Sequence, residues 1–521
     1  MFMTSIRSKL HATTIGFLAT TFAAVGFSGI ANGQVVVSAP QTTPVDLFAD
    51  DTVIVTSTGS ISAVTPDTYA INANGNNSVI DLFGPVSVTS TLLGSSISTI
   101  VQEGDTYNTL NVHQGGNISA TGIPFGVAFI GVLQRNASAD NTVTLENALI
   151  RVESTSADTV GILQDTDSGT NTLQFGANGR ISVLGASVAT GIDQANSTGD
   201  INNLFGSGTQ IDVEALLGDA AAIRQDVAIS GDASNVFGAN ARITAKSTSD
   251  AFGIAQDVTS GVARTVFGSG AFIRIQAGAG GIGILQDSGD NRFGLGQNSV
   301  ISVEAADFGL GLLQEPSDAG GRNQAILQAG SRINVTAGLV AFGILSDAAA
   351  PVTSSLTLEP GAQVSSTGAV AFGVLVDSDN FEMLNRGRIA ATSTDVSPVS
   401  FGVLLDGDNN SFVNHGSVFA DLAPDSHAIL IDGDRNMLSL LTYPVIQGQI
   451  TFNGSLFGAD NTLLVGRGFD AAFTVGASPI GLTVLGQGQS LTVNQIGTNL
   501  LKVVSISSEG FFQSLKRAYD G

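Results

Sequence analysis

A short phrase of alternating hydrophobic and polar residues recurs about every thirty residues along the middle of the chain. It consists of an aliphatic residue, a variable residue, a glutamine and an acidic or polar residue, as in GVLQR at Gly131, GILQD at Gly161 and GIAQD at Gly253. A fixed period of this length, with strand-type rather than helical hydrophobicity, indicates one supersecondary unit stacked on copies of itself.

Each repeat divides into three strand candidates separated by polar turns. In the repeat that begins at Gly161 they are GILQD, then NTLQFG from Asn171, then RISVLG from Arg180. The third strand carries a mostly apolar pair two residues apart, a spacing that places both members on one face of the strand. The thirteen pairs are Ile61/Ala63, Val86/Val88, Ile118/Ala120, Ile150/Val152, Ile181/Val183, Ile211/Val213, Ile243/Ala245, Ile273/Ile275, Ile301/Val303, Ile333/Val335, Val364/Ser366, Ile389/Ala391 and Val418/Ala420.

These repeats predict an all-β fold, a right-handed parallel β-helix of about 13 three-strand rungs with a β-rich C-terminal cap. A β-propeller is disfavoured because each of its blades needs four strands and about 40 residues. The predicted organisation is a signal peptide at residues 1–33, the β-helix at 34–440 and the cap at 441–521. A short helix is expected within the cap, because Phe511, Leu515 and Tyr519 lie at helical spacing.

The first strand predicts a column of buried glutamines. The residue two positions before the glutamine is aliphatic in every repeat and faces the core, so the glutamine also faces inward. Buried amides need partners, and identical amides one rung apart can donate and accept along the axis. The predicted ladder contains Gln102, Gln134, Gln164, Gln194, Gln225, Gln256, Gln286 and Gln314. Beyond it the column changes to Ser346, Val376, Leu405 and Ile431, which predicts a drier core.

The second strand predicts a column of stacked phenylalanines, each followed by glycine in the sequence. A regular aromatic stripe in a repeat is typical of a core rather than of a ligand site. The column contains Phe175, Phe205, Phe237, Phe267 and Phe293.

An acidic residue follows the column of glutamines in most repeats, and several repeats add a second acid shortly afterwards. Carboxylates one rung apart repel each other, and Ca²⁺ would relieve that repulsion. The candidate calcium ligands are Asp165, Asp167, Asp287, Asp290, Asp377, Asp379, Asp406, Asp408, Asp432 and Asp434. The alternative is that these residues are solvated turn formers, since an Asp side chain can bond to nearby backbone. The nonapeptide of calcium-binding β-rolls is missing from the sequence.

The net charge and the N-terminal sequence limit the partners and the cellular location expected for the protein. The formal net charge of −24 argues against nucleic acid and anionic membranes as partners, and the lack of cysteine excludes disulfides. The chain begins with a positively charged stretch at Arg7 and Lys9, an apolar run from Ile15 to Phe27, and small residues before Gln34. This pattern indicates a secretory signal, and the apolar run is too short to span a bilayer.

The sequence offers little evidence of a catalytic site. The chain has four histidines, and His415 occupies the same turn of its repeat as Arg386 does one repeat earlier. The sequence contains no nucleophile elbow, zinc-binding helix motif or P-loop, and it has no tryptophan to stack on a sugar. We therefore expect a protein without enzymatic activity, catalytic residues or an organic cofactor. A β-helical polysaccharide lyase or hydrolase is one alternative, and an architectural component of a surface layer is another.

Repeats such as LNRGRIAAT at Leu384 and FVNHGSVFA at Phe412, alternating with AFGILSD and SFGVLLD, resemble the passenger domains of bacterial autotransporters over about residues 50–440. The resemblance implies a right-handed β-helix carried across the outer membrane and displayed or released at the surface, for adhesion, aggregation or biofilm formation. The implied partners are host or sister-cell surfaces, or matrix glycans and proteins. A translocator barrel, expected of the family, does not appear before Gly521, which implies a separate or missing barrel.

Overall fold

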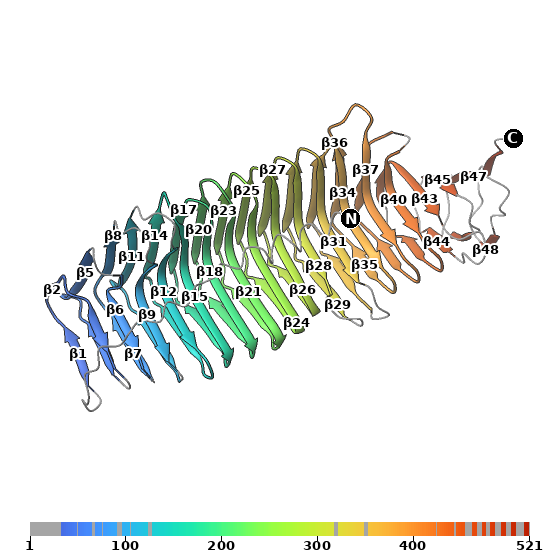
Figure 1. Ribbon diagram of the computed structural model, residues 1–521. Helices are drawn as coiled ribbons and strands as arrows, with labels where there is room; N and C mark the ends of the chain where they lie inside the picture. Colours follow the sequence, from blue (N-terminus) through green and yellow to red (C-terminus); the bar gives the residue numbers. More distant parts are fainter. Residues whose placement is uncertain are drawn as a thin grey trace. The chain divides into compact units, whose positions relative to one another are not determined.

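The computed structural model describes residues 33–48, 51–64, 68–75, 77–90, 96–104, 106–122, 128–316, 321–348, 353–423, 425–441 and 444–453, and the strands at 461–465, 471–475, 480–484, 491–495, 502–506 and 515–519. The predicted signal peptide lies outside these residues except for Gly33. Gln34–Gly521 forms one compact unit. Its described elements are all strands, and they build a parallel β-solenoid of about 12 turns, compared with the 13 expected (Figure 1). The all-β, parallel solenoid prediction is confirmed.

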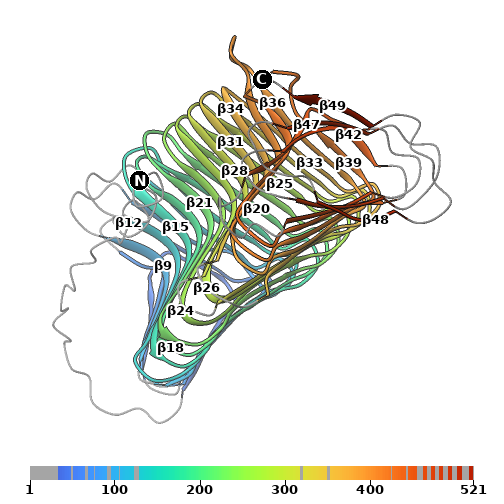
Figure 2. The ribbon, with the colours of Figure 1, turned by 90° about the vertical axis from the view of Figure 1, so that its right-hand side faces the viewer.

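Each turn, or rung, contributes strands to two parallel sheets (Figure 2). The smaller sheet, sheet B, holds the third strand of each repeat. Its strands in spatial order are β2 (Pro40–Gln41), β5 (Ser60–Val64), β8 (Val86–Ser90), β11 (Asn117–Gly122), β14 (Leu149–Ser154), β17 (Arg180–Gly185), β20 (Gln210–Ala215), β23 (Arg242–Ser247), β25 (Phe272–Ala277), β27 (Val300–Ala305), β30 (Arg332–Ala337), β33 (Gln363–Gly368), β36 (Arg388–Ser393), β39 (Ser417–Phe419) and β42 (Val445–Gln447).

The larger sheet, sheet A, holds the first and second strands. The first strands pair in the order β3 (Val45–Leu47), β6 (Ile71–Asn74), β9 (Ile97–Gly104), β12 (Ala128–Asn136), β15 (Asp158–Ser168), β18 (Ala189–Thr198), β21 (Ala220–Ser230), β24 (Ala251–Phe267), β26 (Gly280–Leu295), β28 (Phe308–Glu315), β31 (Val340–Ala348), β34 (Val370–Ser378), β37 (Val399–Asp406), β40 (His427–Asp432), β43 (Gln449–Asn453), β45 (Ala471–Val475), β47 (Leu491–Gln495) and β49 (Leu515–Tyr519).

The second strands pair in a parallel series of their own. They are β1 (Gln34–Val37), β4 (Thr52–Val55), β7 (Ser78–Leu82), β10 (Asn108–Val112), β13 (Asn141–Leu145), β16 (Asn171–Phe175), β19 (Ile201–Phe205), β22 (Ala233–Phe237), then the second halves of β24 and β26, then β29 (Arg322–Leu327), β32 (Ser355–Leu358), β35 (Glu382–Asn385), β38 (Ser411–Asn414), β41 (Met437–Leu440), β44 (Asn461–Val465), β46 (Ile480–Val484) and β48 (Lys502–Ile506). In β24 and β26 the first and second strands run on without a break, which joins both series in one sheet.

The strands beyond the predicted boundary at residue 441 continue the parallel pairing of sheet A, through β43, β45 and β47. The pairing therefore does not break where the cap was expected to begin. The expected terminal helix is wrong for Leu515–Tyr519, which form β49 and pair in register with β47; Phe511 lies outside the described residues. Hydrogen bonding to the open edge of β47 favours a strand here more than the helical spacing of three apolar residues favours a helix.

The core between the two sheets contains all thirteen predicted pairs of the third strand, and each member has at most 3% of its surface exposed. Parallel strands buried on this face bring the same position of each repeat into contact with its copy one rung away. In sheet B, for example, Ile181 lies opposite Ile150 on one side and Ile211 on the other. The repeat in the sequence thus becomes continuous columns of side chains in the structure.

The predicted glutamine ladder is present. All eight side chains are at most 1% exposed. From Gln134 to Gln314, the Nε2 atom of each glutamine of the ladder donates to the Oε1 atom of the glutamine one rung earlier, at 2.7 to 3.1 Å. Most of these amides also donate to backbone carbonyls of the second strand, as Gln286 does to Ala263 and Arg292. The ladder satisfies polar groups in a core that water does not reach.

A second amide ladder on the second strand was not foreseen. Asn108 donates to Asn141 and Asn141 to Asn171, each at 3.0 Å, and Asn291 donates to Asn323 further along. These bonds run from one rung to the next, opposite in direction to those of the glutamines. Between the two asparagine segments the column contains Ile201, Ala233 and Ala263.

The predicted phenylalanine column is formed by four of its five members. Phe205, Phe237 and Phe267 stack with ring centroids 4.3 and 4.6 Å apart, and Phe175 adds a tilted ring at 5.0 Å. Phe293 is the exception, because it lies opposite Thr265 rather than Phe267 and meets the latter edge-on at 6.4 Å. A shift in the pairing of β24 with β26 moves it two residues out of the column.

Replacing Gln164 by alanine tests the ladder. The change removes a donor to Gln134 and an acceptor for Gln194, both fully buried, so the free energy of unfolding should fall by about 2–4 kcal/mol. Urea unfolding followed by circular dichroism measures the effect. The control is Gln174→Ala on the exposed face of β16, which should cost less than about 0.5 kcal/mol. Equal costs for the two variants would contradict a structural role for the ladder.

Candidate functional site

The outer face of the first strands carries regular columns of side chains on β31, β34, β37 and β40. A glycine interrupts the alternation of inward and outward residues there, because both Gly343 and the following Ile344 face the core. A Cβ atom on Gly343 would collide with the carbonyl oxygen of Gly373 and with Val364 of sheet B, so only glycine fits. Positions on the outer side of the strand therefore lie three residues apart across the glycine, at Phe342, which is half-buried, and Leu345, which is only 3% exposed.

We call this surface the outer strip and define it by strands β31, β34, β37 and β40. Register pairing places equivalent residues side by side from strand to strand. The strip comprises Val340, Val370 and Val399; Phe342, Phe372, Phe401 and His427; Leu345, Leu375, Leu404 and Leu430; and Asp347, Asp377, Asp406 and Asp432. Three apolar or aromatic columns thus lie beside one acidic column.

The aromatic column of the strip is a continuous stack. Centroids of Phe342 and Phe372 lie 4.7 Å apart with rings 8° from parallel, and Phe372 and Phe401 lie 5.0 Å apart at 10°. His427 ends the stack 5.6 Å from Phe401, and its Nδ1 lies 3.0 Å from Oγ1 of Thr451. These rings are half-buried, and those inside the stack present edges rather than faces to a ligand. Burial lowers the pKa of His427, with Asp425 opposing the shift.

The acidic column places like charges one strand spacing apart, about 4.8 Å. The pKa of Asp377 is raised, first by burial and then by repulsion from Asp347, Asp406 and Asp379. Burial followed by repulsion from Asp406 also raises the pKa of Asp432. The causes acting on these two carboxyls include no cation.

The second acid of each repeat has a different role. Asp379 accepts the backbone N–H of Asp408 at 2.6 Å, and Asp408 accepts that of Asp434 at 2.7 Å while its other oxygen pairs with Arg435 at 3.0 Å. Each carboxylate thus caps the turn of the following rung. This geometry supports the turn-forming interpretation of these residues.

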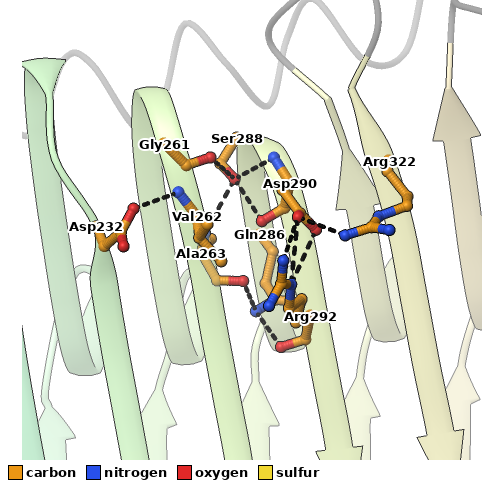
Figure 3. Close-up of polar contacts among 9 residues, drawn as sticks. All are labelled: Asp232, Gly261, Val262, Ala263, Gln286, Ser288, Asp290, Arg292 and Arg322. Carbon is orange, nitrogen blue, oxygen red and sulfur yellow. Dashed lines mark hydrogen bonds and ion pairs between the residues drawn. The ribbon is translucent and has the colours of Figure 1, made fainter. Parts of the chain in front are cut away.

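Asp290, at the corresponding place within β26, contacts two arginines (Figure 3). Its Oδ2 atom lies 2.6 Å from Nη2 of Arg292 and 2.7 Å from Nη2 of Arg322, while its backbone N–H donates to Ser288 at 3.2 Å. Burial raises the pKa of this carboxyl, but the two guanidinium groups outweigh it, so the pKa is lowered overall. A carboxylate held by two arginines is poorly placed to bind a cation.

Charged residues also interrupt the outer face in the earlier rungs. Arg135 lies 3.3 Å from Glu103 and 3.6 Å from Asp165, one rung on either side. Asp193 lies opposite Arg224 at positions where the neighbouring rungs carry leucine or alanine. Burial raises the pKa of Asp193, and the charge of Arg224 opposes the shift. Burial also raises the pKa of Asp165, and there the charge of Arg135 opposes it.

The candidate calcium ligands separate into two places. Asp165, Asp287, Asp377, Asp406 and Asp432 belong to the outward column of the first strand. Asp167, Asp290, Asp379, Asp408 and Asp434 come after it, at or beside the turn to the second strand. Among the described residues, no three acidic or histidine side chains gather in a group that could hold a metal ion. Calcium binding stays an untested prediction of the sequence.

Sequence reasoning missed the aromatic column of the strip. Its members precede the glycine in AFGILSD, AFGVLVD and SFGVLLD, so the signal was present in the repeat. The glycine hid it, because the two consecutive inward residues break the period of two on which the assignment of faces depended.

Neither the models of known families, nor the curated proteins, nor the solved structures include a match to this chain. In the described part of the chain, no helix has the length and hydrophobicity needed to cross a membrane.

Substitution of Asp377 by asparagine tests the repulsion within the acidic column. Because its folded pKa is raised, this group favours folding at low pH and loses that contribution as the pH rises through the folded value. Asp377→Asn should therefore stabilise the fold at pH 7 by roughly 0.3–0.5 kcal/mol, the scale of a screened surface pair, and have little effect near pH 3.5.

Asp290→Asn is the matched control with the opposite sign. Its pKa is lowered by two arginines, so its contribution is present at pH 7 and is lost as the pH falls through the folded value. Urea unfolding at pH 7 and pH 3.5 in low salt distinguishes the two carboxyls. Destabilisation of both variants at pH 7 would show that Asp377 is held by favourable contacts rather than strained by repulsion.

Removal of divalent cations tests the calcium hypothesis. Since the second acids bind backbone N–H groups and arginines, EDTA should leave the melting temperature unchanged within about 1 °C relative to millimolar CaCl₂. Differential scanning calorimetry makes the comparison. A calcium-dependent rise of several degrees that disappears in Asp379→Asn would establish a site.

Proposed function

We propose that this chain is an exported β-solenoid that is displayed at the cell surface or released from it, and that it mediates contact with other surfaces without catalysis. The observation that carries the proposal is the outer strip. Its leucine and aspartate columns run through four successive rungs, and its valine and phenylalanine columns run through three, with His427 at the end of the aromatic column. Apolar side chains that keep part of their surface in water gain further burial when a partner covers them. The secretory pattern in residues 1–33 supports export.

The repetition of the same side chains along the solenoid favours a binding function over a catalytic one. A solenoid presents equivalent side chains at regular intervals, so a partner can bind several rungs at once and gain avidity from contacts that are weak one by one. The net charge of −24 directs such contacts toward neutral or cationic partners. Host, sister-cell and matrix proteins with basic surfaces meet this requirement.

Within this class, the autotransporter passenger is the more specific proposal. The parallel β-solenoid is compatible with it, and the repeat phrases at Leu384 and Phe412 form β35–β36 and β38–β39 of successive rungs. A role as an adhesin or virulence factor at the outer surface follows from this proposal. An architectural role in a surface layer remains the neighbouring alternative.

One arrangement favours the enzymatic alternative. His113 stacks on Phe83 with centroids 4.1 Å apart, its Nδ1 lies 3.0 Å from Glu146, and its Nε2 lies 3.8 Å from Asp81. A histidine between two carboxylates on an outer face has the components of acid–base catalysis on a polysaccharide. The same contacts also fit a surface ion pair between adjacent rungs.

Cell fractionation combined with attachment assays tests the proposed function. An epitope-tagged chain should appear in the surface or extracellular fraction, and deletion of its gene should reduce attachment to cells or matrix at least several-fold. Added purified chain should compete with that attachment. Retention of the chain inside the cell, or unchanged attachment after deletion, would contradict the proposal.

The enzymatic alternative is measured on the same purified chain. Incubation with neutral and acidic polysaccharides should release no new reducing or unsaturated ends. Release that is lost in His113→Ala but kept in His415→Ala, a histidine in a repeat turn, would replace the contact function by catalysis.

A further inference from the structure

We infer that the outer strip binds a cationic amphipathic helix of a partner protein, lying along the axis of the solenoid. The inference deepens the proposed contact function by naming the partner's chemistry, and it rests on that function. Its basis is the juxtaposition of apolar and aromatic columns, on three or four adjacent strands, with a column of carboxylates on four.

The apolar part of the strip is continuous from strand to strand. Parallel pairing places Phe342 against Phe372 and Leu375 against Leu404. The side chains of these columns are half-buried, except for Leu345, which is only 3% exposed. A partner that removes the remaining apolar area from water gains roughly 25 cal/mol per Å². Such a surface suits the apolar face of an amphipathic helix.

The aromatic stack argues against a sugar ligand. Both faces of Phe372 are occupied, by Phe342 on one side and Phe401 on the other. Sugars stack on open ring faces, whereas aliphatic side chains pack well against ring edges. The stack is therefore suited to an apolar partner.

The acidic column sets the charge of the partner. Asp377, Asp406 and Asp432 are exposed, and the carboxyls beside Asp377 and Asp432 contribute to raising their pKa values. Lysine or arginine side chains along one edge of a helix would relieve this repulsion. A second copy of the chain is a poor occupant, because it would bring an identical acidic column and a further charge of −24.

The spacing of the column favours a helix over an extended segment. Rungs repeat about every 4.8 Å, and successive turns of an α-helix repeat every 5.4 Å. Across three intervals the difference is about 2 Å, which a lysine side chain can absorb. Alternate residues of a strand repeat about every 6.8 Å and fall about 6 Å out of step over the same distance.

Peptide binding to the full chain tests the inference. The probe is a fluorescent 18-residue helical peptide with an apolar face and four lysines along one edge, and its control carries glutamates instead of the lysines. Fluorescence anisotropy in low salt should show binding of the lysine peptide, at least ten-fold weaker binding of the glutamate peptide, and a loss of affinity in 0.5 M NaCl.

Variants locate the binding surface. Asp377→Asn combined with Asp406→Asn should weaken the lysine peptide at least five-fold, and Phe372→Ser should do so through the apolar columns. The control combines Glu382→Gln on the exposed face of β35 with Asp395→Asn in an exposed turn, which removes two charges elsewhere. The asparagine variants are expected to fold, because they relieve repulsion; melting curves verify this.

The outcomes separate the inference from the proposed function. Equal affinity for the two peptides, or equal weakening by the control variant, overturns the outer strip as the site. Self-association in analytical ultracentrifugation that is lost in Asp377→Asn/Asp406→Asn overturns it in favour of a second copy. If the chain is exported and promotes attachment but does not bind the lysine peptide, only the inference is contradicted. If the chain binds the peptide but stays in the cell, only the proposed function is contradicted.

Discussion

The buried glutamine ladder is the constraint on which the register of the solenoid depends. Columns of isoleucine, leucine and valine gain nearly the same energy if one rung slides by two residues, because any aliphatic side chain fills the space. A buried amide has no such freedom. Gln194, for example, must meet Gln164 on one side and Gln225 on the other, and a slip would leave both neighbours without a partner in the core.

The second amide ladder complements the first. Glutamine amides donate toward the preceding rung, whereas Asn108 and Asn141 donate toward the following one. Dipoles in the two columns therefore point in opposite directions, so the shorter asparagine column offsets part of the axial dipole of the glutamine column. Where the asparagine column is interrupted, Asn203 exchanges hydrogen bonds with Gln194, and Asn235 donates to Gln225. These two asparagines thus pair with the glutamine ladder where their own column is interrupted.

Much of the fold was predictable because each feature depends on local periodicity. The period gave the solenoid, and the alternation in the first strand placed Gln256 and Gln286 in the core. The predictions that were wrong or missing concern residues where the structure departs from that period. The shift between β24 and β26 displaced Phe293, the glycine before Ile344 concealed the aromatic column, and strand pairing overrode the helical spacing of Leu515 and Tyr519. A candidate site on such a fold lies on the outer surface. Surface positions accept many residue types, so the sequence alone gives little indication of which of them form a site.

The outer strip coincides with the rungs that lack the glutamine ladder. There the inward column contains Ser346, Val376, Leu405 and Ile431, each at most 2% exposed, so apart from Ser346 the column is apolar. Their register must be specified in another way, and two features outside the aliphatic core provide it.

One is the stack from Phe342 to His427, whose rings meet only when the strands are aligned. The other is a series of buried turn asparagines, in which Asn436 accepts the backbone N–H of Asn410, and Asn461 accepts that of Asn436, both at 2.7 Å. Specification of register thus moves from the interior to the turns and the outer face. The aromatic column that we infer to bind a partner therefore also aligns the strands, so a helix docked on it would cross and stabilise the rungs that lack the glutamine ladder.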